Sequence, residues 1–99
     1  MVEKIIWSPL AVETYNEIAE YLLYKFGESS VQKFVALVDE RLQLICTRPR
    51  MFRLTHQRKN TYATAINKKL TLTYRYQPRK KQIELVVFWG MQEPERKPD

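Results

Sequence analysis

The spacing of apolar residues in the first half of the chain predicts an amphipathic helix. Between Pro9 and Phe26 the apolar positions recur mainly at intervals of three and four, the period of one helix stripe; they are Ala11, Tyr15, Ile18, Ala19, Leu22 and Phe26. Ser8 is a suitable N-cap, and Pro9 suits the first helical position. Gly27 stands where a left-handed C-terminal cap is expected. We therefore expect a helix over Pro9–Phe26.

A second apolar stripe follows at once and predicts a second helix. Its members are Val31, Phe34, Val35, Val38, Leu42 and Ile45. The run Ser29-Ser30-Val31-Gln32 has the form of a capping box, and Pro49 stops the helix. Because only about three residues would join the two helices, we expect an antiparallel hairpin whose stripes face one core.

The remaining segments have the composition of strands. β-prone runs lie at Glu3–Trp7, Thr61–Ile66, Leu70–Tyr76 and Ile83–Trp89. Residues 48–60 have no period, so we expect a loop that can hold a short strand near Met51–Leu54. The nearly continuous apolar run Leu85–Trp89 is typical of a strand that is central or covered on both faces. We expect Phe88 and Trp89 in the core; if either projects outward, it would anchor a partner.

This element order predicts an α+β fold. An N-terminal strand is followed by the antiparallel helical hairpin and then by a three-stranded antiparallel meander, which forms one sheet packed on the hairpin. The length of 99 residues fits a single domain over residues 1–99. Residues 90–99 are polar and contain Pro94 and Pro98, so we expect an extended or frayed tail.

The charge changes this picture because of where it falls. The 17 Lys and Arg residues exceed the 11 Asp and Glu residues by +6. All of the excess lies in residues 48–83, which hold no acid but eleven bases: Arg48, Arg50, Arg53, Arg58, Lys59, Lys68, Lys69, Arg75, Arg79, Lys80 and Lys81. Such a block attracts phosphates and acidic protein segments alike. Lys68-Lys69 and Arg79-Lys80-Lys81 fall in expected turns, where solvated bases also collect, so both interpretations stay open.

Several kinds of chemistry lack their residues in this sequence. The single cysteine, Cys46, excludes an internal disulfide framework and is best explained as a small packed residue. The single histidine, His56, lies in a polar loop without a neighbouring carboxylate, which favours a surface histidine. No Cys/His cluster indicates a metal, and we expect no cofactor. No segment has the length of a signal peptide's apolar core or of a membrane span, so we expect a cytoplasmic protein.

Together these landmarks resemble the RelE/ParE superfamily of toxins from bacterial type II toxin–antitoxin systems. The resemblance covers nearly the whole chain and rests on a sum of short motifs. They are Trp7-Ser8-Pro9, Pro49 with Phe52, Leu72-Thr73-Tyr74-Arg75-Tyr76, Ile83 to Gly90, and Gln92-Glu93-Pro94. It implies the same α+β fold and a cognate antitoxin as partner.

Two branches of this superfamily differ in chemistry. RelE-like members are ribosome-dependent endoribonucleases that cut mRNA with Arg, Lys and often Tyr on the sheet, whereas ParE-like members are described as DNA gyrase poisons. The resemblance places the RelE-like sheet arginine at Thr71 and the second catalytic arginine at Gln92. The remaining RelE-like candidates for catalysis are Lys68, Lys69 and Arg75. On the ParE side, Met91 stands where an arginine commonly precedes Gln92.

The sequence therefore favours a ParE-like toxin of a type II, plasmid-stabilization system that inhibits DNA gyrase by binding and is not an enzyme. Candidate residues for binding the target or the antitoxin are Arg48, Arg50, Arg53, Arg58, Lys59, Arg75, Trp89 and Gln92. The alternatives are a RelE-like mRNA interferase acting on ribosome-bound mRNA, and a non-toxic member that acts only in a complex.

Overall fold

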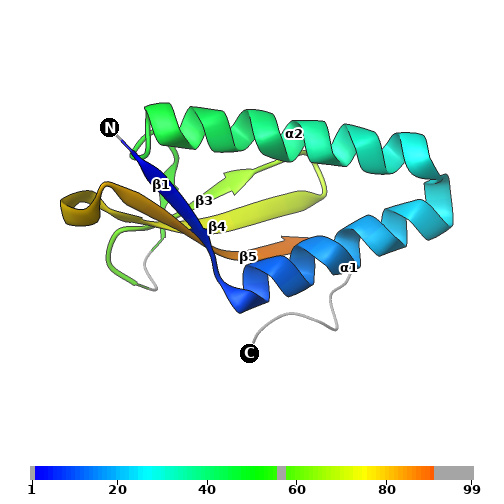
Figure 1. Ribbon diagram of the computed structural model, residues 1–99, viewed down its shortest axis with the longest axis horizontal. Helices are drawn as coiled ribbons and strands as arrows, with labels where there is room; N and C mark the ends of the chain where they lie inside the picture. Colours follow the sequence, from blue (N-terminus) through cyan, green and yellow to red (C-terminus); the bar gives the residue numbers. More distant parts are fainter. Residues whose placement is uncertain (1, 56–57, 91–99) are drawn as a thin grey trace.

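The computed structural model describes residues 2–55 and 58–90 of the chain. Two helices are inserted between the first strand and the remaining strands (Figure 1). In chain order the elements are β1 (Lys4–Trp7), α1 (Pro9–Phe26), α2 (Glu28–Thr47), β2 (Arg53–Leu54), β3 (Thr61–Ala65), β4 (Leu70–Gln77), the 3-10 turn η1 (Pro78–Lys80) and β5 (Gln82–Gly90). The expected tail lies outside the described residues, apart from Gly90, which ends β5.

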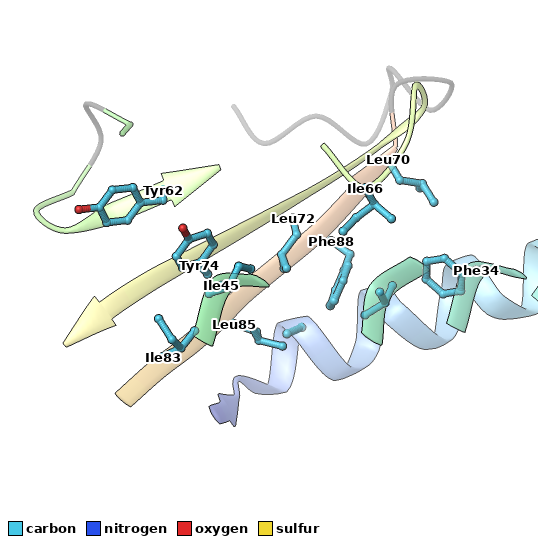
Figure 2. Close-up of a cluster of buried hydrophobic side chains, with 12 residues drawn as sticks. Phe34, Ile45, Tyr62, Ile66, Leu70, Leu72, Tyr74, Ile83, Leu85 and Phe88 are labelled. Atoms are coloured by element: carbon cyan, nitrogen blue, oxygen red, sulfur yellow. The ribbon is translucent and has the colours of Figure 1, made fainter. Parts of the chain in front are cut away.

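The strands form one five-stranded sheet in the order β1-β5-β4-β3-β2. The meander β3-β4-β5 is antiparallel as expected, and β1 joins it in parallel beside β5. The buried side chains of both helices pack against one face of this sheet (Figure 2). The predicted α+β class is thus confirmed, and β2 falls inside the segment expected to hold a short strand. The parallel pairing of the two chain-distant strands was not part of the prediction.

The two helices meet at a single residue, Gly27, and not across a three-residue loop. Ser8 caps α1 as predicted, since its side-chain oxygen accepts a hydrogen bond from the Ala11 amide at 3.0 Å. Gly27 has φ 91° and ψ −178°, so it takes the positive φ expected of a terminal glycine but not the left-handed helical conformation. The predicted capping box is wrong. The helix α2 already begins at Glu28 with Gly27 as its N-cap, and the Gly27 carbonyl accepts from the amide of Ser30 at 3.2 Å.

Two hydroxyl groups of α1 and its cap tie this helix to β5. The strand β1 ends where Trp7 pairs with Leu85, and a register shift in the β4–β5 pairing leaves a bulge at Val86. Beyond this point, α1 takes the place of a neighbouring strand. The Ser8 hydroxyl donates to the Val86 carbonyl at 2.9 Å, and the Thr14 hydroxyl accepts from the Phe88 amide at 3.0 Å. These bonds satisfy backbone groups that would otherwise be buried without partners.

An aromatic cluster fills the core beneath α1. The Phe88 ring lies 5.6 Å from the Trp7 ring and 5.4 Å from the Tyr15 ring, centroid to centroid. Phe88 is 1% exposed, as predicted for a core residue. The same prediction is wrong for Trp89, which is 39% exposed. Successive strand residues point to opposite faces, so a strand that buries Phe88 turns Trp89 away from the helices.

In the middle of β4, Tyr74 joins this strand to the loop after α2. It is fully buried, and its ring stacks on Tyr62 at 5.4 Å between centroids (Figure 2). Its hydroxyl donates a hydrogen bond of 2.6 Å to the Pro49 carbonyl. Burial raises the pKa of Tyr74 above its usual range, and Tyr62 adds to this effect. This contact holds the first residues of the basic loop against the sheet.

Candidate functional site

The sheet face that points away from the helices carries the position of the RelE-like sheet arginine. Thr71 occupies this position near the start of β4, opposite Ala65 on β3 and Trp89 on β5. Paired residues share a face, so a methyl, a hydroxyl and an indole lie side by side there. None of the three carries a charge. The second position, Gln92, lies outside the described residues.

The three remaining catalytic candidates are not brought together. Lys68 and Lys69 are exposed in the turn before β4, where the Asn67 side chain accepts hydrogen bonds from the Lys69 and Leu70 amides. Arg75 lies six positions after Lys69, near the opposite end of β4, and forms an ion pair of 2.8 Å with Glu84. At about 3.3 Å per residue, the strand separates the lysines from Arg75 by roughly 20 Å. The charge of Arg75 is compensated by Glu84 and is not shared with the two lysines.

The predicted binding residues fall into separate places. Arg48 and Arg50 line a shallow hollow of about 470 Å³ with Pro49, Met51 and Tyr76. The Arg50 guanidinium lies over the Tyr76 ring, 5.1 Å from its centroid. Such stacking holds the guanidinium in place while leaving its donors available. Arg53 is exposed on the edge strand β2, and Trp89 lies near the far end of the sheet.

A second hollow shares the lining residue Tyr76 with the first. It has a volume of about 380 Å³ and lies between the segment before β3 and the η1 turn. Its lining residues are Lys59, Asn60, Arg75, Tyr76, Gln77, Pro78, Arg79 and Lys80. Arg58 is exposed beside Lys59. Arg79 and Lys80 were not among the predicted binding residues. Within residues 48–83, no sequence feature distinguishes these turn bases from Lys68 and Lys69, which lie elsewhere.

The described residues form no site for metal binding or for a cysteine nucleophile. No group of three or more His, Cys, Asp or Glu residues in residues 2–55 and 58–90 could hold a metal ion. Burial raises the pKa of the Cys46 thiol, which keeps it protonated and is the opposite of what a nucleophile needs. His56 lies outside the described residues. No described helix has the length and hydrophobicity needed to cross a membrane.

A comparison with protein families identifies the chain. Residues 5–93 match the family described as "ParE toxin of type II toxin-antitoxin system, parDE". The chain belongs to this family. The ParE match begins at the second residue of β1 and covers the hairpin and the whole meander. The superfamily resemblance drawn from the short motifs is therefore confirmed.

Solved structures with the same fold include toxins from both branches. The chromosomal ParDE system from P. aeruginosa matches with a TM-score of 0.72 at 13% identity, covering 91% of this chain and 96% of that chain. The intact E. coli RelBE complex matches with a TM-score of 0.62 at 11% identity, covering 86% of this chain and 92% of that chain. A YoeB dimer from Staphylococcus aureus matches with a TM-score of 0.65 at 20% identity, covering 90% of this chain and 97% of that chain. At these identities the likeness concerns the fold alone. No curated protein sequence matches significantly.

Proposed function

We propose that this ParE-family protein is a toxin that inhibits DNA gyrase by binding it, and that a cognate antitoxin neutralises it. The family match over residues 5–93 supports the toxin assignment, and the matched ParDE and RelBE structures are toxin–antitoxin systems. The choice between binding a target and cutting RNA depends on the surface of the sheet that faces away from the helices.

The observation that carries the proposal is the row formed by Ala65, Thr71 and Trp89. Cleavage of a phosphodiester develops negative charge on the phosphoryl oxygens, and one well-placed donor can contribute about 3–4 kcal/mol to the transition state. A hydroxyl, a methyl and an indole supply no fixed positive charge at this position. Arg75 is held by Glu84, which further weakens the case for a nuclease. The same row suits binding, because an exposed indole is a common anchor in protein interfaces.

The antitoxin has a separate surface available on the hairpin. Near Gly27, α1 exposes Leu23 (50%), Tyr24 (88%) and Phe26 (62%). Apolar exposure on this scale is typical of a protein interface. Figure 1 shows this tip of the hairpin extending beyond the end of the sheet. We propose that an extended or helical antitoxin segment covers the hairpin and a free sheet edge.

A supercoiling assay tests this function. Purified protein is added to gyrase, ATP and relaxed plasmid, and the plasmid topology is read on an agarose gel. We expect supercoiling to stop at micromolar or lower protein, and to resume when the antitoxin is added. Trp89→Ala should weaken the inhibition about tenfold, because interface tryptophans often contribute more than 1 kcal/mol. If gyrase is unaffected at micromolar protein, the proposed mechanism is wrong even though the fold is right.

A further inference from the structure

Three loops that are distant in sequence gather at one end of the sheet. They are residues 48–51 after α2, residues 58–60 before β3, and the η1 turn between β4 and β5. Figure 1 shows η1 and the end of α2 on the side of the molecule opposite the junction of α1 and α2. The two hollows described above lie among these loops and share Tyr76 as a lining residue. We call their combined lining the Tyr76 groove.

The Tyr76 groove carries a concentrated and uncompensated positive charge. Among the residues that the structure describes, no acidic residue lines either hollow. Of the six described cationic residues of the groove, Arg75 is paired with Glu84. The other five form no ion pair with any described residue: Arg48, Arg50, Lys59, Arg79 and Lys80. All five are exposed, so their heads are free to meet an anion from solution.

We propose that the Tyr76 groove binds the phosphate backbone of a nucleic acid duplex without regard to sequence. The site is distinct from the sheet position of the RelE-like nucleases, because Thr71 and Gln77 lie at opposite ends of β4, roughly 20 Å apart at 3.3 Å per residue. It does not depend on gyrase being the target, and it needs no catalytic residue.

The lining of the groove favours a duplex over a single strand. Proteins that hold single strands stack the bases on open aromatic rings. Among the described lining residues Tyr76 is the aromatic one, and the Arg50 guanidinium already covers its ring, 5.1 Å from the centroid. Bases that stay paired in a duplex need no such ring, and their phosphates are reached by Arg and Lys side chains and by amides. Asn60 and Gln77, which carry side-chain amides, line the second hollow, and the Gln77 amide oxygen accepts a hydrogen bond from Gln82.

The lining also favours phosphate over an acidic protein segment. A bound peptide gains much of its affinity from apolar pockets or from pairing with a strand edge. Among the described lining residues, Met51 is the large hydrophobic one that is substantially exposed, at 46%. The strand in the lining, β4, is already paired with β5, and the Tyr76 amide donates to the Asn60 carbonyl on its other side. Affinity here must come mainly from charge, which is the pattern of backbone binding to nucleic acids.

The test is a salt titration of duplex binding with a matched control. The anisotropy of a fluorescent 20-base-pair DNA duplex is followed with the full-length protein, with the η1 variant Arg79→Gln/Lys80→Gln, and with the control Lys68→Gln/Lys69→Gln. Both double variants remove two exposed turn cations and change the net charge equally. We expect the η1 variant to lose at least tenfold in affinity at 0.1 M salt, and its salt slope to fall by about 1.8, since each lost phosphate contact removes about 0.9.

The control should lose less than about threefold and keep its salt slope, because bases at the far end of β4 lie beyond a Debye length of about 10 Å. A second variant, Arg48→Gln/Lys59→Gln, samples the other two loops and should behave like the η1 variant, with circular dichroism confirming that each folds. Equal losses of duplex affinity in all variants, the control included, would mean that only the net charge matters, and would overturn the proposed site. Tighter binding of a poly-glutamate peptide or of the matching single strand would overturn the choice of duplex.

Discussion

Replacing Phe88 by alanine is expected to lower the free energy of unfolding by about 3–5 kcal/mol. Phe88 is 1% exposed and packs against Trp7 and Tyr15 on the strand that α1 covers. Its removal leaves a cavity that neighbours on a helix and two strands cannot all move to fill. Since a domain of this size has a total stability of about 5–15 kcal/mol, much of the population should unfold under mild denaturant. Urea unfolding followed by circular dichroism measures the loss.

Trp89→Ala is the matched control for this substitution. Trp89 is the next residue on β5 but is 39% exposed on the opposite face, so we expect a loss on the order of 1 kcal/mol. Equal losses for the two variants would contradict the observed placement of these side chains. The same pair separates stability from function. Phe88→Ala should act through folding, whereas Trp89→Ala should affect gyrase inhibition in a protein that remains folded.

The buried hydroxyl of Tyr74 is expected to contribute to stability at neutral pH and to lose part of this contribution at alkaline pH. Tyr74→Phe should cost about 1–2 kcal/mol at neutral pH, because the Pro49 carbonyl loses its donor. The pKa of Tyr74 is raised by burial and by Tyr62, whereas in the unfolded chain it is about 10. Above pH 10 the unfolded chain therefore releases a proton that the native state keeps. The stability contributed by the protonated native form is complete below about pH 10 and is lost as the pH rises above it.

The measurement compares unfolding free energies of the two proteins between pH 8 and pH 11. The wild-type value should fall with an additional slope of up to about 1.4 kcal/mol per pH unit above pH 10, and Tyr74→Phe should lack this part. Burial also raises the pKa of Tyr15, with a further contribution from Asp39, but both proteins retain that residue. The difference between the curves thus reports Tyr74. Parallel curves would mean that Tyr74 is exposed to solvent or already ionised in the folded protein.

The helices could be predicted from the sequence because their information is local. The apolar stripe, the Ser8 cap and Gly27 gave α1 the bounds that the structure has. The error at the start of α2 is also local in origin. Ser29 and Ser30 look like caps, but once Gly27 ends α1 with a positive φ, its own carbonyl starts the next helix. The serines are then already helical.

The face assignments on β5 could not be predicted, because they depend on a bulge. Because this strand is apolar over most of its length, the sequence does not show that the alternation of side chains between the two faces shifts by one residue at Val86. The register before the bulge pairs Thr73 with Val87, and continued unchanged it would place Arg75 opposite Leu85. The shift instead places Arg75 opposite Glu84, where the ion pair forms. From the sequence, Arg75 was therefore predicted as a binding residue, whereas in the folded protein Glu84 compensates its charge.

The basic block shows the same limit for the candidate site. Eleven bases in residues 48–83 suggested one binding face. Lys68 and Lys69 lie in the turn between β3 and β4, at one end of the sheet. Arg79 and Lys80 lie in η1 at the other end, where they line a hollow with Lys59. The unpaired cations of the Tyr76 groove come from three loops, and their proximity is a consequence of topology. No spacing rule in the sequence encodes it.

We propose that this toxin binds its target and does not cut RNA. Primer extension on ribosome-bound mRNA, in a translation reaction with purified protein, distinguishes the two activities. At a protein concentration that blocks gyrase, we predict mRNA that stays full length, because the Thr71 row offers no charge for phosphoryl transfer. Discrete cleavage within the translated codons, lost in Lys69→Gln or Arg75→Gln, would contradict the claim and assign the protein to the RelE-like branch.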